Sequence, residues 1–558
     1  MAIPQPRLWR DAFREPAVFT GLQASDSDND LLDTSNHLVL LDFLPETTRV
    51  VYTVIRNVLL PHLRRAMGIL PFQSSLPSEP IAALRKRAAL ARLFFGCFLV
   101  LLGAFYLTHL REGHVWGDDF AMYIAQAKNI ALGHPLADTG YIFNPHRPVL
   151  GPSAYPPVFP LLLSPVYRIW GLNLAIMKTE IVLIFLLALF LAFELISVSL
   201  THAYSAVLVA ILGCSPYFYE IKDNVTSDLP FLCFVMLSLL VMSRCEIQGW
   251  RSVPLALSAS ICVYLSFATR TAGVSLLACL ILSSIQQRGA SARNAAISAL
   301  SAMTLMAIHS AVFGGNGSYL AQVHIPLYGV VQNGIVYGWR LYRYVLGIRN
   351  AVVGGAFLLL LGTLGSAGIV HRLRIWVSYL EVFTVSYALI ILLWTSENDG
   401  RLLVPLLPMW LLYIGVALRQ LQFSQKRAVC GMIVVCVGVA FVSRYSRISN
   451  GPIREGLGDA SFVRTCEYIR SSTPKDSVLV FSKPRLLALV TERKASTYDT
   501  PHNDGELWED FTSIRARYVL VNRQFADDRE YLEPLILRNA AHAHEIFAEA
   551  QYHLYEIL

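Results

Sequence analysis

Long apolar runs dominate the middle of the chain and are separated by short polar segments. A helix needs about 20 apolar residues to cross the hydrocarbon core of a bilayer, and these runs approach or reach that length. The pattern therefore predicts eleven membrane-spanning helices between residues 93 and 444. Their approximate bounds are 93–110, 175–198, 203–219, 228–244, 252–268, 271–286, 294–313, 351–370, 375–394, 402–418 and 427–443.

The pattern changes after Arg444, where short apolar runs alternate with helical periodicity. It predicts strands at Ser477–Phe481, Tyr518–Asn522, His544–Ala548 and Tyr552–Ile557, and helices at Asp459–Ser471, Gly505–Ile514 and Asp528–Ala541. Residues 445–558 are thus expected to form a small α/β domain. The expected fold class is a mainly α-helical polytopic membrane protein with this domain at its C-terminal end. Residues 1–92 read as a cytoplasmic N-terminal segment, either a plain tail or a segment on the inner leaflet.

Composition supports the membrane interpretation. Of the 558 residues, 54% are hydrophobic and only 15% are charged, whereas soluble domains carry about 25% charged residues. The formal net charge is +7, but the basic residues of the apolar middle fall mostly in short loops. That distribution is typical of membrane topology and not of a nucleic-acid-binding groove.

The basic loops also predict the orientation. With eleven spans, they all lie on one side, which the positive-inside rule identifies as cytoplasmic. They contain Arg85, Lys86, Arg87, Arg92, Arg244, Arg251, Arg288, Arg293, Arg372, Arg374, Arg419, Lys426 and Arg427. The N-terminus is then expected inside the cell and residues 445–558 outside.

A pair of carboxylates opens a helical pattern in the first outer loop, which covers residues 110–174. Asp118 and Asp119 precede apolar residues at helical spacing, and Gly133 and Pro135 are expected to end that helix. An aspartate at a helix N-terminus is often only an N-cap, favoured by the helix dipole. A catalytic role for the pair is the alternative.

Several short segments share their order and spacing with a known family. They are Gly117-Asp118-Asp119-Phe120 with Tyr123, the run Tyr155-Pro156-Pro157 to Pro165, Ser227-Asp228-Leu229-Pro230-Phe231, Thr269-Arg270-Thr271-Ala272-Gly273, and Arg401 to Pro408. Over about residues 90–420 the chain resembles the GT-C superfamily of membrane glycosyltransferases. The similarity is to the protein O-mannosyltransferase and lipid A aminoarabinose transferase type.

The resemblance implies a reaction. Such enzymes take a sugar from a polyprenyl-phosphate carrier and pass it, with inversion, to an acceptor hydroxyl at the outer membrane face. Because the phosphate leaves as an anion, the chemistry requires a base for the hydroxyl and positive charge for the phosphate. Asp118 matches the family's first-loop aspartate and is the expected base. Asp119 would assist it, orient the acceptor or cap the helix; the family often has Glu at that position.

Arginines at the outer ends of helices are expected to bind the donor phosphate. Arg270 and Arg401 are the first candidates, because an unpaired charge near lipid is costly; snorkelling to the interface is the alternative. Arg340 and Arg343 would bind the same phosphate or help cover the site, although such an aromatic and basic loop also suits a membrane anchor. The expected substrate-shaping residues are Tyr123, Tyr155, Pro156 and Asp228; for Asp228 an N-cap is an even alternative.

No cofactor is expected to be required. Asp118, Asp119 and Asp228 could together hold Mg²⁺ or Mn²⁺, but arginines alone can neutralise a phosphate. The expected partners are a polyprenyl-phosphate-linked sugar, membrane lipid and a lipid, polysaccharide or protein acceptor, with no nucleic acid. The expected location is the bacterial inner membrane. Two other functions stay open: a multi-span transporter or lipid flippase, and a scaffold that presents the outer domain. Transporters usually contain internal repeats, and this sequence shows none.

Overall fold

The computed structural model describes residues 81–147, 150–313, 327–394, 400–500 and 504–558. The expectations for residues 1–80 lie outside the described residues. The first predicted span begins earlier than expected, because its helix starts at Ile81 and not near Leu93.

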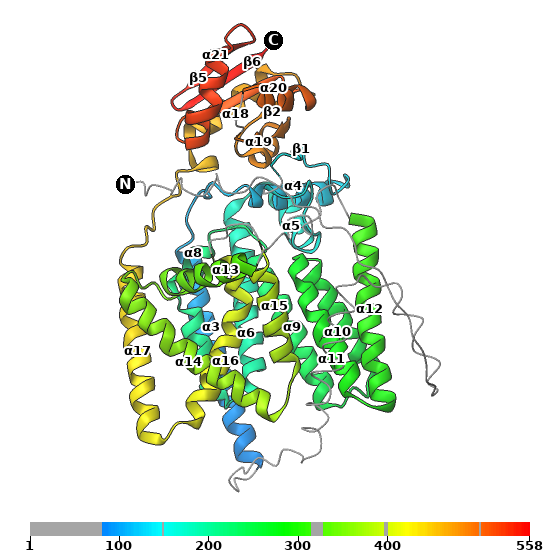
Figure 1. Cartoon of the computed structure of the whole chain (residues 1–558), viewed down its shortest axis with the longest axis vertical. Helices are drawn as coiled ribbons and strands as arrows, with labels where there is room; N and C mark the ends of the chain where they lie inside the picture. The colour runs from blue at the N-terminus through cyan, green and yellow to red at the C-terminus, as the bar shows by residue number, and fades with distance from the viewer. Residues whose placement is uncertain (1–80, 148–149, 314–326, 395–399, 501–503) are drawn as a thin grey trace, which may run out of the picture. The chain divides into compact units, whose positions relative to one another are not determined.

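Helices form most of the described chain up to residue 445 (Figure 1). In order they are α3 (Ile81–Thr108), α4 (Asp119–Leu132), α5 (Val158–Trp170), α6 (Leu174–Ser197), α7 (His202–Gly213), α8 (Pro216–Ile221), α9 (Asp228–Ile247), α10 (Val253–Phe267), η3 (Thr271–Val274), α11 (Ser275–Gln286), α12 (Gly289–Phe313), α13 (Leu327–Arg340), η5 (Leu341–Val345), α14 (Ala351–Ile375), α15 (Tyr379–Leu392), η6 (Arg401–Leu406), α16 (Leu407–Gln420) and α17 (Phe423–Tyr445). The polytopic helical architecture expected from the apolar runs is confirmed.

Among the described residues, seven helical stretches are long and apolar enough to cross a membrane. They are Lys86–Thr108, Leu174–Ser197, Asp228–Ile247, Gly289–Phe313, Ala351–Ile375, Arg401–Gln420 and Phe423–Tyr445. The other four predicted runs form the shorter apolar helices His202–Gly213, Val253–Phe267, Thr271–Gln286 and Tyr379–Leu392. The run 203–219 is not one helix. It breaks at Ser215, whose side chain caps α8, and Pro216 takes the first position of that helix.

The helices differ in how far they are enclosed by protein. The apolar windows of α6, α9 and α16 are 56–67% buried, whereas that of α17 is only 11% buried. On α17, Val434, Val439 and Val442 are 57–71% exposed. A continuous apolar face of this kind is unfavourable in water and suits contact with lipid. We therefore interpret α6, α9 and α16 as the centre of the helical part and α17 as a peripheral helix.

The C-terminal domain is an α/β unit built on one six-stranded sheet. Its strand order is β1-β3-β2-β4-β6-β5, parallel from β1 to β4 and antiparallel from β4 to β5. The strands are β1 (Tyr141–Ile142), β2 (Val478–Val480), β3 (Lys494–Ser496), β4 (Tyr518–Asn522), β5 (Ala543–Glu549) and β6 (Tyr552–Ile557). The helical segments are η7 (Gly456–Gly458), α18 (Ala460–Ser472), α19 (Pro484–Thr491), α20 (Asp504–Ser513), η8 (Asp528–Leu532) and α21 (Glu533–Arg538). The four predicted strands and three predicted helices are confirmed, with the last helix divided into η8 and α21.

The first loop is part of this domain as well as of the helical part. Its strand β1 pairs with β3, so that Tyr141 lies opposite Ala495. At the start of the loop, Lys178 of α6 donates to the carbonyl oxygens of Arg111 and Gly113, both at 2.6 Å. Trp116 packs edge-on against Phe462 and Phe525, with ring centroids 5.3 and 5.2 Å apart. The loop therefore joins the helices to the sheet, and the candidate site lies along it.

Candidate active site

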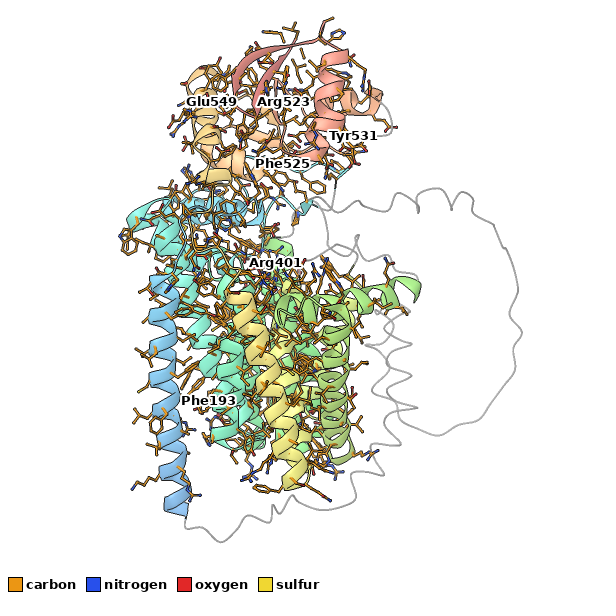
Figure 2. All side chains as sticks on the ribbon, turned by 90° about the vertical axis from the view of Figure 1, so that its left-hand side faces the viewer. Phe193, Arg401, Arg523, Phe525, Tyr531 and Glu549 are labelled. Atoms are coloured by element: carbon orange, nitrogen blue, oxygen red, sulfur yellow. The ribbon has the colours of Figure 1, made fainter. Side chains whose placement is uncertain are left out.

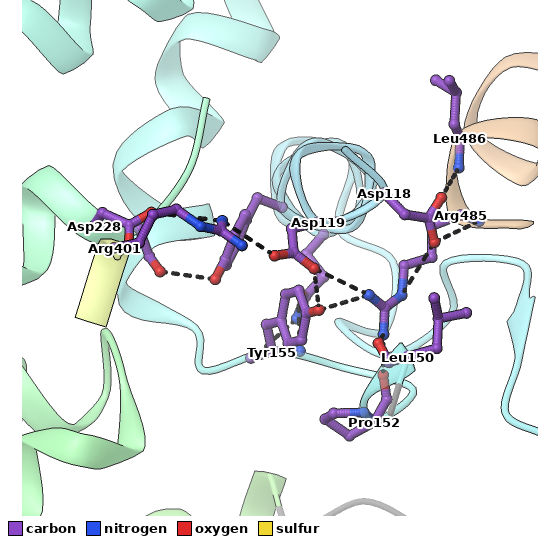
Figure 3. Close-up of polar contacts among 12 residues, drawn as sticks. Asp118, Asp119, Leu150, Pro152, Tyr155, Asp228, Arg401, Arg485 and Leu486 are labelled. Carbon is purple, nitrogen blue, oxygen red and sulfur yellow. Dashed lines mark hydrogen bonds and ion pairs between the residues drawn. The ribbon is translucent and has the colours of Figure 1, made fainter. Parts of the chain in front are cut away.

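Asp118 occupies the N-cap position of α4 but does not cap it. Its side chain makes no capping hydrogen bond to its own helix. Its carboxylate instead accepts from the backbone N–H groups of Arg485, at 3.4 Å, and Leu486, at 3.1 Å. These N–H groups belong to the first turn of α19, where no intrahelical acceptor is available. Asp118 is thus buried where the first loop meets the C-terminal domain (Figure 3).

Asp119 faces a different set of groups. Its Oδ1 accepts from the Tyr155 hydroxyl at 2.6 Å and from Arg485 Nη1 at 3.3 Å, while its Oδ2 lies 3.5 Å from Arg401 Nη1 (Figure 3). Its side chain is 35% exposed, against 5% for that of Asp118. Of the two expected catalytic carboxylates, Asp119 is therefore the more accessible one.

The two carboxylates also differ in their electrostatics. Burial raises the pKa of Asp118 to about 6, an effect that Arg485 and the Leu486 N–H only partly oppose. Burial also favours the protonated form of Asp119, but Arg401, Arg485 and the Tyr155 hydroxyl outweigh it and lower the pKa of Asp119. At neutral pH Asp119 is therefore held as a carboxylate.

Tyr155 is fixed by its backbone as well as by its hydroxyl. The Gln126 side chain of α4 accepts from the Tyr155 N–H at 3.1 Å and donates to its carbonyl oxygen at 2.9 Å. The Tyr155 and Tyr123 rings have centroids 4.9 Å apart, and the Tyr123 hydroxyl lies 2.8 Å from Ser227 Oγ. The next residue, Pro156, is half-buried. The expected shaping residues of the first loop are thus packed beside Asp119 and reach toward the start of α9.

Asp228, at the start of α9, lies among cations. Its carboxylate is fully buried and forms an ion pair with Arg270. The Arg401 Nη1 atom is 3.8 Å from Asp228 Oδ2, which also accepts from the Thr226 hydroxyl at 2.8 Å. The Arg270 and Arg401 side chains are 21% and 23% exposed. Both expected phosphate-binding residues thus lie beside Asp228, and their side chains are partly exposed.

Two glycines let the backbone position these arginines. A Cβ on Gly273 would lie 2.5 Å from the backbone nitrogen of Phe267, so only glycine fits where the chain turns back after Arg270. Gly400 has a φ of 97° immediately before Arg401, a conformation that side-chain-bearing residues rarely adopt. Arg401 then begins η6, and Figure 2 shows it at the end of the helices nearest the C-terminal domain.

Arg340 and Arg343 lie on α13 and η5. Arg340 is close to the Arg401 loop, because its Cβ would be 3.7 Å from a Cβ on Gly400. The Arg343 guanidinium stacks on the ring of Trp339, 5.2 Å from its centroid. The structure therefore places Arg340 beside the site and Arg343 in a contact within its own segment.

Arg485 is a residue of the site that the sequence did not predict. It belongs to α19, and its side chain is 1% exposed. Besides Asp119 it contacts the Tyr155 hydroxyl and two first-loop carbonyl oxygens. The available signal was a single charge in the otherwise apolar run from Pro484 to Val490. Nothing in the sequence places that charge near residues more than 300 positions earlier.

The carboxylates of the site are matched with arginines. Among the described residues, no group of three or more His, Cys, Asp or Glu side chains is arranged to hold a metal ion. Asp228 faces Arg270 and Arg401, and Asp119 faces Arg401 and Arg485. The carboxylates of the cluster are thus paired with arginines whose side chains, for Arg270 and Arg401, are partly exposed.

Comparisons with known proteins identify the fold. No protein-family model matches the chain, and no curated protein matches it significantly in sequence. Among solved structures it is similar to ArnT from Cupriavidus metallidurans in the apo state, with a TM-score of 0.51 and 13% identity, covering 83% of this chain and 97% of that one. The same protein bound to undecaprenyl phosphate gives 0.50 and 12% over the same shares.

A further similarity is to the oligosaccharyltransferase of Archaeoglobus fulgidus in the apo form, with a TM-score of 0.48 and 12% identity over 82% of this chain and 74% of that one. ArnT is a lipid A aminoarabinose transferase of the GT-C superfamily. The chain therefore has the GT-C glycosyltransferase fold that its loop segments predicted.

Proposed function

We propose that this protein is a glycosyltransferase that moves a sugar from a polyprenyl-phosphate carrier to an acceptor hydroxyl, with inversion, at the outer face of the membrane. The observation that carries the proposal is the cluster of Asp119, Asp228, Arg270 and Arg401 at the ends of apolar helices. The ArnT structure with undecaprenyl phosphate has the same fold, which supports a lipid-phosphate donor.

The arginines and the carboxylates of the cluster would have different roles. Arg270 and Arg401 would bind the donor phosphate and stabilise the charge that develops on it as the glycosidic bond breaks. A carboxylate would accept the proton of the attacking hydroxyl. One base and one displacement give inversion at the sugar carbon. The acceptor hydroxyl would belong to a lipid, a polysaccharide or a protein.

We propose Asp119 as the base and Asp118 as the residue that docks α19. A general base must first be within reach of the proton it removes, and its pKa matters after that. Asp119 is the more exposed carboxylate and faces Arg401, whereas Asp118 is enclosed by the first turn of α19. Basicity favours Asp118, whose pKa is about 6. The sequence-based assignment of the base to Asp118 therefore stays a prediction. The experiment below tests both assignments.

The experiment compares the wild type with Asp119→Asn and Asp118→Asn. The purified chain is supplied with labelled polyprenyl-phosphate sugars and candidate acceptors. We expect Asp119→Asn to lower the transfer rate by about 10²–10⁴-fold, the usual contribution of a general base. Asp118→Asn should lower the transfer rate less, and it should do so by destabilising the protein where α19 docks. A larger loss in Asp118→Asn would assign the base to Asp118, and flipping or uptake of lipid by a wild type that transfers no sugar would contradict the function.

A further inference from the structure

Arg485 lies in the C-terminal domain, but its side chain contacts residues of the first loop. Nη1 donates to the Tyr155 hydroxyl at 2.6 Å and to Asp119 Oδ1 at 3.3 Å. Nη2 donates to the carbonyl oxygens of Leu150, at 2.5 Å, and Pro152, at 3.2 Å. The guanidinium carbon is 4.8 Å from the ring centroids of both Tyr155 and Tyr141.

These contacts determine the direction of the Tyr155 hydrogen bond. A guanidinium has five N–H donors and no acceptor, so the Tyr155 oxygen must accept from Arg485. The hydroxyl hydrogen is then directed to Asp119, whose Oδ1 is 2.6 Å away. Asp119 in turn receives its hydrogen bonds as a carboxylate. Arg485 thus orients both side chains.

The charged and titratable groups around Asp119 come from several elements. They are Asp118 and Tyr123 beside it, Tyr155 of the first loop, Arg270 before η3, Arg401 of η6 and Arg485 of α19. Arg401 approaches Oδ2 and Arg485 approaches Oδ1. The carboxylate is therefore held between one cation from the helical part and one from the C-terminal domain.

We propose that Arg485 is a positioning residue of the transferase site, through which the docked C-terminal domain fixes the orientation of Tyr155 and Asp119. This inference rests on the proposed function for its catalytic consequence. Its structural part, the coupling between Arg485 and Asp119, is independent of the reaction. The C-terminal domain is then a component of the site and not an attached module.

Arg493 provides a matched control. It is also a buried arginine of the C-terminal domain, and its guanidinium donates to the carbonyl oxygens of Arg470, Thr473 and Thr491. Its partners lie within that domain. Arg493→Met should therefore destabilise the domain as Arg485→Met does, without changing the surroundings of Asp119.

The first test is the pH dependence of transfer in the full chain. An opposite charge within about 4–6 Å lowers a carboxyl pKa by roughly 1–3 units. Arg485→Met should therefore move the acidic limb of the kcat profile up by about one pH unit and lower kcat by about tenfold or more. Arg493→Met should leave the pH of the acidic limb of the kcat profile unchanged. Equal profiles for the two variants would reduce Arg485 to a structural residue and overturn the proposal.

The second test does not require activity. Apparent melting temperatures are measured for Asp119→Asn, Arg485→Met and the double variant, and for the same cycle with Arg493→Met. Coupled residues give non-additive effects, whereas distant ones add. We expect a smaller effect of Asp119→Asn in the Arg485→Met background and additivity in the control cycle. Additivity in both cycles would overturn the inference, while a wild type without transfer activity would overturn only the proposed function.

Discussion

Asp118 and Asp119 are neighbours in the chain and both face Arg485, yet the rest of their surroundings differ because successive side chains of a helix point about 100° apart. One carboxylate is buried against backbone N–H groups of α19, and the other lies between two arginines. Burial raises the pKa of Asp118 to about 6, whereas the cations lower that of Asp119. The adjacent pair thus separates into a docking carboxyl group with a raised pKa and an arginine-paired carboxyl group with a lowered pKa.

The raised pKa of Asp118 predicts a pH effect on stability. Its folded-state pKa of about 6 exceeds the ordinary value of 3.8, so between these values the folded state binds more protons than the unfolded state. This contribution is complete below the ordinary pKa and is lost as the pH rises through about 6. Two pKa units correspond to about 3 kcal/mol as an upper bound.

The measurement is the apparent melting temperature of wild type and Asp118→Asn between pH 4 and 7. The asparagine keeps an acceptor for the α19 N–H groups but does not titrate. We expect the wild type to lose stability relative to Asp118→Asn as the pH increases. A difference between the two proteins that is constant with pH, or that grows in favour of the wild type, would contradict the prediction.

The helices and strands that the sequence could predict are those marked by a sufficiently long apolar or periodic run. Long apolar runs, the helix that Gly133 ends and the strands β4 and β6 follow from periodicity within a window of residues. The strands β1 and β3 have two and three residues, and neither stands in a run of four apolar residues such as 478–481 around β2. The helix α19 has only eight residues, too few for a clear periodic signal. The pairing of Tyr141 with Ala495 joins segments that no local pattern connects.

The short reach of local sequence patterns also explains which residues of the site could be predicted. Asp119, Asp228, Arg270 and Arg401 each stand in a recognisable segment beside a helix start, so they could be proposed together. Arg485 stands in α19, and its role arises only when α19 packs against α4. The run 203–219 was expected to form one helix. It divides into α7 and α8 because Pro216 begins a new helix.

The turn between α10 and η3 predicts the effect of a small substitution. In Gly273→Ala the new methyl group would overlap the Phe267 backbone, which cannot move aside as a flexible side chain would. Overpacking of this kind costs about 1–3 kcal/mol. Because the adjustment would displace Arg270 from Asp228, we expect weaker donor binding as well as a lower melting temperature.

Gly362 of α14 is the matched control, since a Cβ there would meet nothing within 4 Å. Gly362→Ala should be neutral or stabilising by up to about 1 kcal/mol, as for an alanine in place of a helical glycine. Retention of wild-type stability and donor affinity by Gly273→Ala would show that the turn is not constrained as described.

Charges at the two ends of the helices predict the orientation of the protein across the membrane. Asp228 and Arg401 begin α9 and η6 at the end that carries the site. At the opposite ends, Arg244 lies in the last turn of α9 and Arg419 in the last turn of α16. The last turn of α14 adds Arg372 and Arg374. The positive-inside rule therefore predicts that these last turns lie in the cytoplasm and that the site and the C-terminal domain lie outside.

Reporter fusions to the full chain test this orientation. An alkaline phosphatase fused after Leu558 should be active, because that enzyme folds only outside the cytoplasm, and a fluorescent protein there should be dark. The opposite result is expected for fusions in the turn between α14 and α15, after Trp376. Three helices, α15, α16 and α17, lie between the two positions, so a report of the same side from both would mean that they do not all span the membrane as proposed. A cytoplasmic C-terminus would place Arg270 and Arg401 on the inner face, and a lipid-linked donor at the outer face could not reach them.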